Sequence, residues 1–510
     1  MTDPSPLVRF RVGVQKTEVS ASRADLIPFL RQQLQGVLKR RGQPEMTLSF
    51  LERTCRFPTG LLPLLMAKLD MRGLSYSFAE PSEKEGGWPV WIDDVANLIP
   101  RRLPDQAASS IGLRDYQRLA AIKLLRQGRG IAEIATGGGK SEIIAAILTG
   151  LACWLERHPL ALLVLPPSRN LFEQTVTRLK RRGLRILPHT AIKTKSRVDP
   201  RSNPPRKGGI VISMIDTLRS LLDERSFLND WPWDAFLMDE VHHANAATWR
   251  KCAQIVNAPR RFGFSATVFS SSSPHENYDD LELIGMFGPL AVRLPYSHLA
   301  RTGFLPCPTV VFQDLRESAP LLNRNDSDWS RIEKYGVVEN EIRNQLLCDV
   351  VAHGLRTDPE NARFVFLVVK LEHGRNLLRI CRSRGLGEGF FLHGQGPPET
   401  ADGKSKALEA DVLSGFRTGS FRILVGSVRF DEGQTFPPFS DLILCGGGRG
   451  GQNNRRLFQR LGRSLHQTSN SLRVWDVFDR HHPILENQAR ERLDALRREG
   501  FRAHVVTGKL

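Results

Sequence analysis

Short apolar runs alternate with longer amphipathic stretches along the chain from about residue 110. The runs have the length and composition of buried strands, and helical stretches lie between most of them. In the first half they are IAEIA (131–135), LALLVL (160–165), GIVIS (209–213), AFLMD (235–239) and FGFSA (262–266). Short apolar strands separated by helices predict an α/β fold in which helices cover both faces of a parallel sheet.

The same alternation returns in the second half of the chain. Its apolar runs are RFVFLVV (363–369), GFFLHG (389–394), FRILVG (421–426), DLILCG (441–446) and LRVWDVF (472–478). Two successive blocks of this kind predict two similar domains of the nucleotide-binding type, joined near residue 305. We place the first domain at 106–305 and the second at 306–510.

Residues 1–105 have a different pattern and predict a small mixed α/β accessory domain. We expect strands in LVRFRVGVQ (7–15) and LSYSF (74–78) and helices in DLIPFLRQQLQGVLKRR (25–41) and GLLPLLMAKLDMRG (60–73). The charged segment EPSEKEGGWP (80–89) is typical of a loop or linker. The basic helix could bind DNA or pack against the rest of the protein, and the pattern leaves both open.

The composition adds a strong positive charge to this picture. With 72 Lys and Arg against 54 Asp and Glu, the formal net charge is +18. A surplus of this size favours a polyanionic partner such as nucleic acid. The seven cysteines are scattered without a CxxC pair, which argues against a zinc ribbon and fits free thiols in a reducing compartment. No apolar run has membrane-spanning length and no signal peptide is evident, so we expect a cytoplasmic protein.

A glycine-rich segment separates the first strand of the 106–305 block from a helix. It reads Thr136-Gly137-Gly138-Gly139-Lys140-Ser141. Glycines let backbone N–H groups turn toward phosphate oxygens, and the following helix N-terminus favours anions. Lys140 is expected to reach the β- and γ-phosphates and the Ser141 hydroxyl to bind Mg²⁺. The strict GxxxxGK[ST] pattern is not met, because Ile134 replaces its first glycine.

Two adjacent acidic residues, Asp239 and Glu240, end the strand AFLMD. Ligands of open α/β sheets bind at the carboxyl ends of the strands. There Asp239 is expected to hold Mg²⁺ through water, and Glu240 to orient or deprotonate the attacking water. A strand that simply ends in polar residues is the alternative, which the upstream phosphate loop makes less attractive.

Taken together, these motifs resemble helicase superfamily 2. Its motifs are matched in order by Gln117 in LRDYQ, ATGGGKS, DEVH (239–242), Ser265-Ala266-Thr267 and QRLGR (459–463), over about residues 111–480. The resemblance implies two tandem RecA-like domains and ATP with Mg²⁺ as cofactors. It also implies that Gln117 reads the adenine, although Gln117 could instead cap a helix.

The resemblance assigns further roles in both domains. His242, Ser265, Thr267 and Gln459 would couple hydrolysis to movement, Gly433 would lie at the nucleotide, and Arg463 would act as an arginine finger. The expected DNA contacts are Pro167, Arg169, Thr217, His393 and Ser427. Two positions depart from the family pattern, with Thr435 in place of an aspartate and His466 in place of a second finger. An imidazole stabilises developing negative charge less well than a guanidinium, so turnover could be weak.

The segment LIGMFGPLAVRLPYSHLARTGFLPCPTV (283–310) is similar to the interdomain passage of UvsW-like phage helicases, XPB-like translocases and restriction-enzyme motor subunits. That branch implies DNA, duplex or branched, as the partner, and ATP hydrolysis coupled to unwinding or branch migration. Two alternatives remain open. One is an RNA helicase, and the other is a nucleic-acid-binding switch with little turnover.

Overall fold

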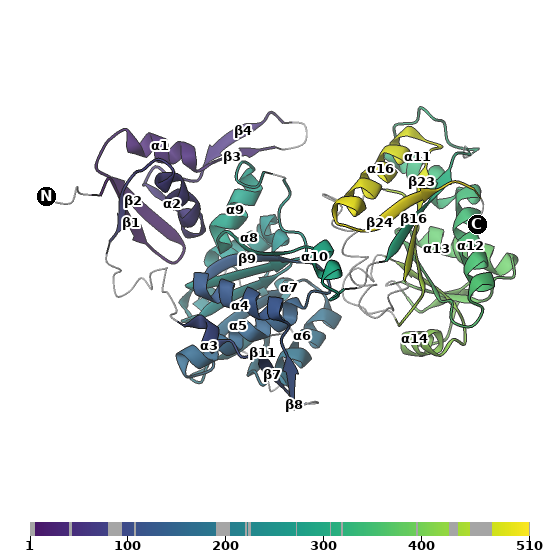
Figure 1. Ribbon diagram of the computed structural model, residues 1–510, viewed down its shortest axis with the longest axis horizontal. Coiled ribbons are helices and arrows are strands. Elements are labelled where there is room, and N and C mark those ends of the chain that lie inside the picture. Colours follow the sequence, from purple (N-terminus) through teal and green to yellow (C-terminus); the bar gives the residue numbers. More distant parts are fainter. Residues whose placement is uncertain are drawn as a thin grey trace. The chain divides into compact units, whose positions relative to one another are not determined.

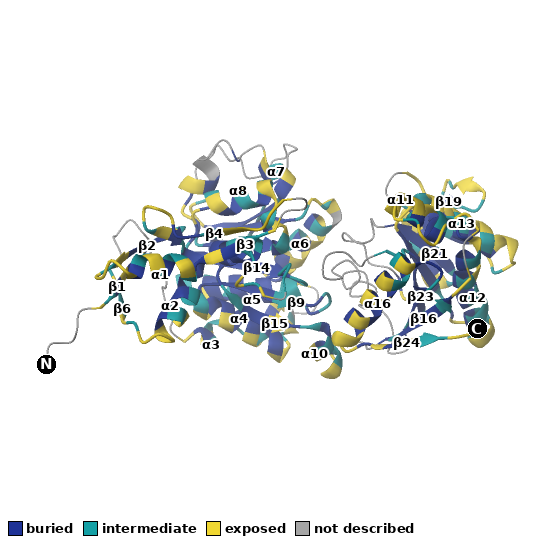
Figure 2. Cartoon of the chain, turned by 90° about the horizontal axis from the view of Figure 1, so that it is seen from above, coloured by how far each residue is buried: buried dark blue, intermediate teal, exposed yellow. Residues whose placement is uncertain are grey.

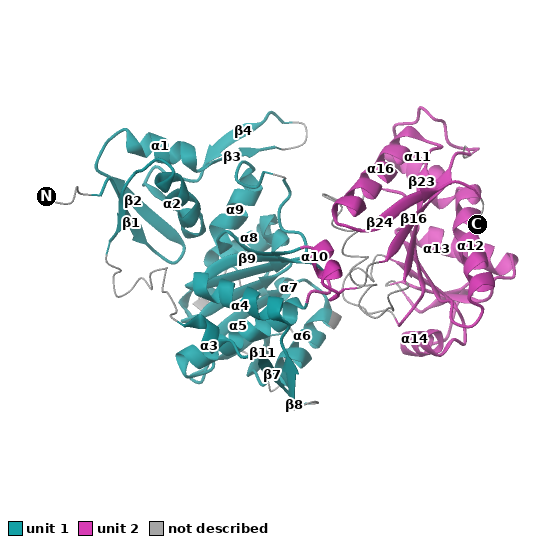
Figure 3. Ribbon diagram, in the orientation of Figure 1, with its two compact units in different colours: residues 1–135, 139–294 teal, residues 136–138, 295–510 magenta. Residues whose placement is uncertain are grey.

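The computed structural model describes residues 6–39, 43–79, 94–106, 109–189, 204–219, 222, 226–271, 273–305, 308–317, 320–393, 396–427, 437–448 and 472–508. The chain forms two compact units (Figure 3). The first comprises residues 1–135 and 139–294, and the second comprises residues 136–138 and 295–510. Within the described residues, no helix is both long and apolar enough to cross a membrane.

The N-terminal part of the first unit is a four-stranded sheet with order β5-β2-β1-β6, packed on two helices (Figure 1). Its elements are β1 (Val8–Val12), β2 (Lys16–Ala21), α1 (Leu26–Gln33), β5 (Arg56–Pro58), a 3-10 turn at Thr59–Leu61, α2 (Leu62–Asp70) and β6 (Tyr76–Phe78). Residues on β1 alternate between buried and exposed, as expected for a sheet with one face on a core. A hairpin of β3 (Gln35–Leu38) and β4 (Met46–Ser49) extends from it.

The helix predicted over 25–41 is wrong in its second half. Helix α1 ends at Gln33, and the chain continues as β3. Tertiary contact decides this, because the Val37 N–H donates to the carbonyl of Glu276, 2.7 Å away. Gly36 also lies so close to helix α9 that a Cβ there would be 2.8 Å from the Tyr278 Cα. Local helical spacing does not encode a packing partner more than two hundred residues away.

The main sheet of the first unit is entirely parallel within its seven strands, with order β11-β12-β10-β13-β14-β9-β15. The strands are β9 (Arg129–Ile134), β10 (Leu160–Leu165), β11 (Ile186–His189), β12 (Gly209–Met214), β13 (Ala235–Asp239), β14 (Arg260–Ser265) and β15 (Leu290–Leu294). The helices are α3 (Val95–Leu98), α4 (Asp115–Gln127), α5 (Lys140–Leu155), α6 (Arg169–Arg181), α7 (Ile215–Arg219), α8 (Ala247–Ile255) and α9 (Tyr278–Phe287). A short hairpin of β7 (Arg102–Asp105) and β8 (Ser109–Gly112) lies between α3 and α4 in the chain.

The second unit is built on a nine-stranded sheet with order β20-β19-β18-β21-β17-β22-β23-β16-β24. Only the two short outer pairs, β18 with β19 and β19 with β20, are antiparallel. The strands are β16 (Thr309–Leu315), β17 (Phe364–Val368), β18 (Gly389–Leu392), β19 (Glu399–Thr400), β20 (Gly403–Lys404), β21 (Ile423–Ser427), β22 (Asp441–Leu444), β23 (Arg473–Asp479) and β24 (Arg502–Val506). The helices are α10 (Tyr296–Arg301), α11 (Trp329–Glu333), α12 (Glu341–Thr357), α13 (Leu371–Ser383), α14 (Glu409–Thr418) and α16 (Pro483–Arg498).

Burial follows the predicted pattern in both units (Figure 2). Strands β10 and β17 are buried at every position, since helices cover both faces of a parallel sheet. The α/β prediction is therefore confirmed, and each of the ten predicted strands is present with ends that differ by a few residues. The sequence interpretation missed β11 and β15 of the seven-stranded sheet and β16, β19, β20 and β24 of the nine-stranded sheet.

Candidate functional site

The glycine-rich loop connects β9 to α5, as predicted, and Lys140 is the first residue of that helix. Gly137 and Gly139 have φ angles of 94° and 80°. Residues with a Cβ rarely adopt such values, so the loop depends on glycine at both places. The helix N-terminus adds unpaired backbone N–H groups and the positive end of the helix dipole. Loop and helix together form a place suited to phosphate.

Gln117 lies directly beside this loop. It is buried at the start of α4, and its Oε1 accepts a hydrogen bond from the Arg114 backbone N–H at 3.0 Å. Its Nε2 occupies the space that a Cβ on Gly139 would need. Gln117 therefore caps α4, which was one of its two predicted roles. Its contact with the glycine-rich loop is compatible with the other, recognition of the adenine.

Three charged side chains meet where the loop faces the end of β13. Lys140 Nζ lies 2.9 Å from Glu240 Oε1 and 3.5 Å from Asp239 Oδ1. All three side chains are largely buried, with 13% to 16% of their surface exposed. Glu240 has a left-handed backbone with φ 49°, and its N–H donates to Asp239 Oδ1 at 3.0 Å. This turn directs both adjacent carboxylates to the lysine, although alternate residues of a strand face opposite sides.

Burial raises the pKa of Asp239, Lys140 opposes that shift, and the neighbouring Glu240 adds to it. Two carboxylates sharing one ammonium group would be stabilised by a further positive charge. Their oxygen atoms are the donors that Mg²⁺ prefers, so the residues present fit this ion. Among the described residues, no cluster of three or more His, Cys, Asp or Glu could hold a metal alone. Few protein ligands are usual for Mg²⁺ that is bound together with phosphates.

Ser265, the last residue of β14, connects Glu240 to the next segment. Its buried hydroxyl donates to Glu240 Oε2 at 3.1 Å, lies 3.0 Å from the Thr267 carbonyl, and is 2.8 Å from His242 Nδ1. The Thr267 N–H approaches the same hydroxyl at 3.3 Å. The residues predicted to couple hydrolysis to movement in this unit therefore contact one another around one glutamate.

Ser141 and its neighbours attach α5 to α6. Arg178 Nη1 donates to Ser141 Oγ at 3.2 Å from an exposed side chain. Arg182 is buried and pairs with Glu142 Oε2 at 2.8 Å and with Asp105 Oδ2 at 2.5 Å. Arg178 and Arg182 were not anticipated, because a basic helix end predicts only a favourable dipole interaction.

The residues proposed as nucleic-acid contacts in the first unit follow two other strands of the sheet. Pro167 and Arg169 come after β10, and Thr217 lies in α7 after β12. Carboxyl ends of parallel strands meet at one edge, so these residues share an edge with Asp239. Pro167 and Arg169 are exposed, although Arg169 Nε pairs with Glu173 Oε1 at 2.9 Å.

In the second unit, Ser427 is the last residue of β21 and is buried. His393 follows β18, and its Nε2 lies 3.0 Å from Glu399 Oε1. That glutamate is also held by Arg375 through two contacts of 2.7 and 2.9 Å. The His393 ring therefore faces a buried carboxylate rather than solvent. Gly433, Gln459 and Arg463, together with Thr435 and His466, lie outside the described residues.

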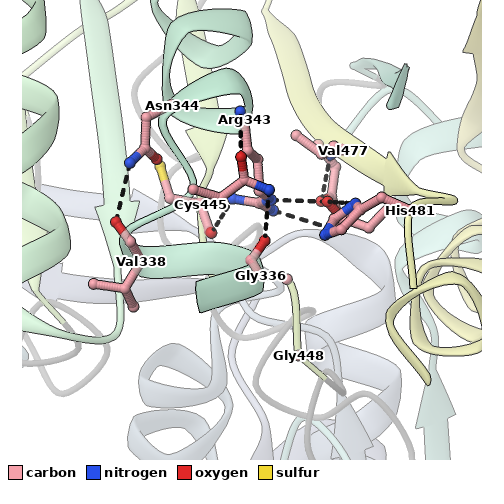
Figure 4. Close-up of polar contacts among 12 residues, drawn as sticks. Gly336, Val338, Arg343, Asn344, Cys445, Gly448, Val477 and His481 are labelled. Carbon is pink, nitrogen blue, oxygen red and sulfur yellow. Dashed lines mark hydrogen bonds and ion pairs between the residues drawn. The ribbon is translucent and has the colours of Figure 1, made fainter. Parts of the chain in front are cut away.

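The second unit contains a buried polar network that sequence reasoning missed (Figure 4). Arg343 on α12 is fully buried, and it donates to Asp479 Oδ1 and to the Cys445 carbonyl, each at 2.8 Å. Arg492 on α16 donates to the carbonyls of Gly447 and Gly448 at 2.9 and 2.8 Å. These glycines directly precede the segment with Gln459 and Arg463. The chain entering that segment is thus held by two buried arginines.

Fold and site together define an α/β protein with a phosphate loop opposite paired carboxylates. Residues 110–270 match the family described as "Type III restriction enzyme, res subunit". Over 422 residues the chain is 24% identical to the DNA 3'-5' translocase XPB2 of Sulfurisphaera tokodaii, covering 76% of this chain and 85% of that protein.

Two solved structures are also similar. The type ISP restriction-modification enzyme LlaBIII bound to DNA is 14% identical, with a TM-score of 0.55, over 78% of this chain and 32% of that one. The UvsW protein of phage T4 is 15% identical, with a TM-score of 0.42, over 98% of this chain and 99% of that one. The chain is thus similar to translocases and restriction-enzyme motor proteins, and its two mostly parallel sheets flanked by helices form two tandem RecA-like domains.

Proposed function

We propose that this protein is a DNA translocase or helicase that couples ATP hydrolysis to unwinding or branch migration of duplex or branched DNA. The observation that carries the hydrolytic part is the contact of Lys140 with both Asp239 and Glu240. The choice of DNA is supported by the XPB2 relative, named a DNA translocase. The net charge of +18 supports a polyanionic partner in general.

In this proposal ATP binds at the loop Thr136–Ser141, with Gln117 beside its glycines. Lys140 neutralises phosphate charge, and ATP replaces the carboxylates as its partner. Glu240 is then free to orient or accept a proton from the attacking water. Ser141 and Asp239 would hold Mg²⁺, which supplies further positive charge to the phosphates when it is bound. Gly433 and Arg463 are assigned to the same reaction from the second domain.

We further propose three domains, an accessory domain at 1–105, an ATP-binding domain at 106–305 and a C-terminal domain at 306–510. Pro167, Arg169, Thr217 and Ser427 are proposed to contact DNA phosphates. His242, Ser265, Thr267 and Gln459 are proposed to couple hydrolysis to movement. Because the proposed contacts are with the phosphates of the DNA backbone, we expect little base specificity. His393 is also proposed as a DNA contact, and its Nε2 lies 3.0 Å from Glu399 Oε1.

The test compares ATP turnover with forked DNA, linear duplex and single-stranded RNA, for the wild type, Lys140→Ala and Glu240→Gln. We expect strong stimulation by DNA and a loss of about 100-fold or more in each variant. Lys123→Ala, an exposed lysine on α4, is the matched control and should behave as wild type.

Stimulation by RNA alone would support an RNA helicase instead. A wild-type protein that binds DNA without stimulated hydrolysis would support the binding switch and contradict the proposed motor.

A further inference from the structure

One face of helix α9 packs against the N-terminal domain. Its Leu281 and Ile284 belong to the same buried cluster as Phe10, Phe57 and Leu65. In Figure 1, α9 lies next to the purple N-terminal elements. The core of the N-terminal domain is therefore completed by a helix that belongs, in sequence, to the ATP-binding domain.

The N-terminal domain contacts α9 at both ends of the helix, and at one end it contacts the helix backbone itself. At the C-terminal end of α9, a Cβ on Gly60 would overlap the Ile284 carbonyl oxygen and lie 2.6 Å from that of Gly285. At the N-terminal end, the Phe50 and Tyr278 rings stack with centroids 4.6 Å apart. Backbone contact at one end and ring stacking at the other leave α9 little freedom to shift relative to the N-terminal domain.

The first turn of α9 also holds the chain that follows Ser265-Ala266-Thr267. Asp280 is fully buried. Its Oδ1 accepts hydrogen bonds from the Ser270 N–H at 2.8 Å and the Ser270 hydroxyl at 3.0 Å, and its Oδ2 accepts one from the Ser271 N–H at 2.9 Å. Charged acceptors make stronger hydrogen bonds than neutral ones, and the helix N-terminus stabilises the carboxylate.

A continuous set of contacts thus runs from the N-terminal domain to the candidate catalytic glutamate. Phe50 stacks on Tyr278, and Asp280, two residues further along α9, holds Ser270. Five residues before Ser270, Ser265 donates to Glu240 Oε2. A movement of α9 would shift Ser270, and through residues 265–270 it would change the contact of Ser265 with Glu240.

We propose that Asp280 is a positioning residue for Ser265 and Glu240, and that α9 couples the N-terminal domain to nucleic-acid-stimulated ATP hydrolysis. This inference rests on the proposed function. In this role the N-terminal domain holds α9 in place. Helix α9 in turn fixes one end of residues 265–270, which contact Glu240 at their other end. Coupling of this kind has a functional readout.

That readout is the stimulation ratio, the ATP turnover with saturating forked DNA divided by the turnover without DNA. A variant that is only partly folded lowers both rates equally and leaves the ratio unchanged. We expect Asp280→Asn to lower the ratio at least about fivefold, because one of the backbone N–H groups would face an amide NH₂ instead of an oxygen. Asp279→Asn makes the same charge change in the same helical turn and should retain the wild-type ratio.

Two further variants keep the test decisive. Ser270→Ala removes only the hydroxyl contact, so its ratio decides the matter if Asp280→Asn is not obtained folded. Phe50→Leu acts from the N-terminal domain, and its effect on the ratio should be less than additive with that of Asp280→Asn. Wild-type ratios in all these variants would overturn the inference. A stimulation ratio of one in the wild-type protein itself would instead overturn the proposed function.

Discussion

The amide of Gln117 lies against Gly139, so that a Cβ at position 139 would overlap Gln117 Nε2. The residue matched to adenine recognition is therefore in direct contact with the phosphate loop. A side chain added at Gly139 would displace the Gln117 amide. This relationship makes Gly139 a sensitive position for a reason beyond its backbone conformation.

Gly139→Ala is expected to lower ATP affinity and turnover strongly, because it combines a left-handed backbone with a steric overlap. The backbone part alone costs about 1–2 kcal/mol. Adding Gln117→Ala to Gly139→Ala removes the overlap and should recover part of the lost stability. Thermal unfolding and ATP titration of both proteins measure this.

Gly73→Ala isolates the backbone part, since Gly73 has a φ of 64° and a Cβ added there would meet no other atom within 4 Å. Equal losses of stability in Gly139→Ala and Gly73→Ala would show that the Gln117 contact is unimportant.

Acid should destabilise the second unit through His373. Burial lowers the pKa of this histidine to about 3, with the Arg343 charge as a smaller cause, and its Nε2 lies 2.8 Å from Asn344 Oδ1. Its pKa is about 6.5 in an unfolded chain, so the unfolded state binds the proton first. The stability from neutral His373 is complete above about pH 6.5 and is lost progressively as the pH falls toward 3.

Between pH 7.5 and 5.5, this one group should remove about 1.4 kcal/mol of stability. Denaturation of the wild type and His373→Gln at both pH values measures the difference. The variant should lose less stability than the wild type over this interval, whereas His275→Gln, an exposed position, should lose as much. An identical pH dependence in His373→Gln and the wild type would exclude this role of His373.

Replacing only one partner of the buried pair Arg343–Asp479 should lower the stability of the fold strongly. Neither side chain is exposed, and their closest atoms are 2.8 Å apart. Asp479→Asn leaves a buried guanidinium without its counterion and is expected to cost about 3–5 kcal/mol. Denaturation midpoints, with hydrogen exchange of α12, check this.

The exposed Arg382–Asp402 pair is the control, because solvent screens its charges. Asp402→Asn should leave the midpoint where it is in the wild type. A midpoint for Asp479→Asn that also equals the wild-type value would show that the buried pair is not needed for stability.

Much of the fold follows from local patterns in the sequence. Alternating apolar strands and helices predicted both parallel sheets, because strands buried on both faces must be apolar throughout. The positions of Lys140 after a strand and of Asp239 and Glu240 at the end of another were predicted for the same reason, since carboxyl ends of parallel strands share one edge.

Tertiary structure alone decided where those elements meet. Helix α1 ends early because β3 packs on α9, and the buried Arg343 pairs with Asp479 across 136 positions of sequence. Gln117 and Gly139 could be matched to motifs separately, but their contact could not. Local propensity and periodicity report only which face of an element is buried. The partner of that face, and hence the role of α9 between the N-terminal domain and Glu240, depends on packing between distant segments.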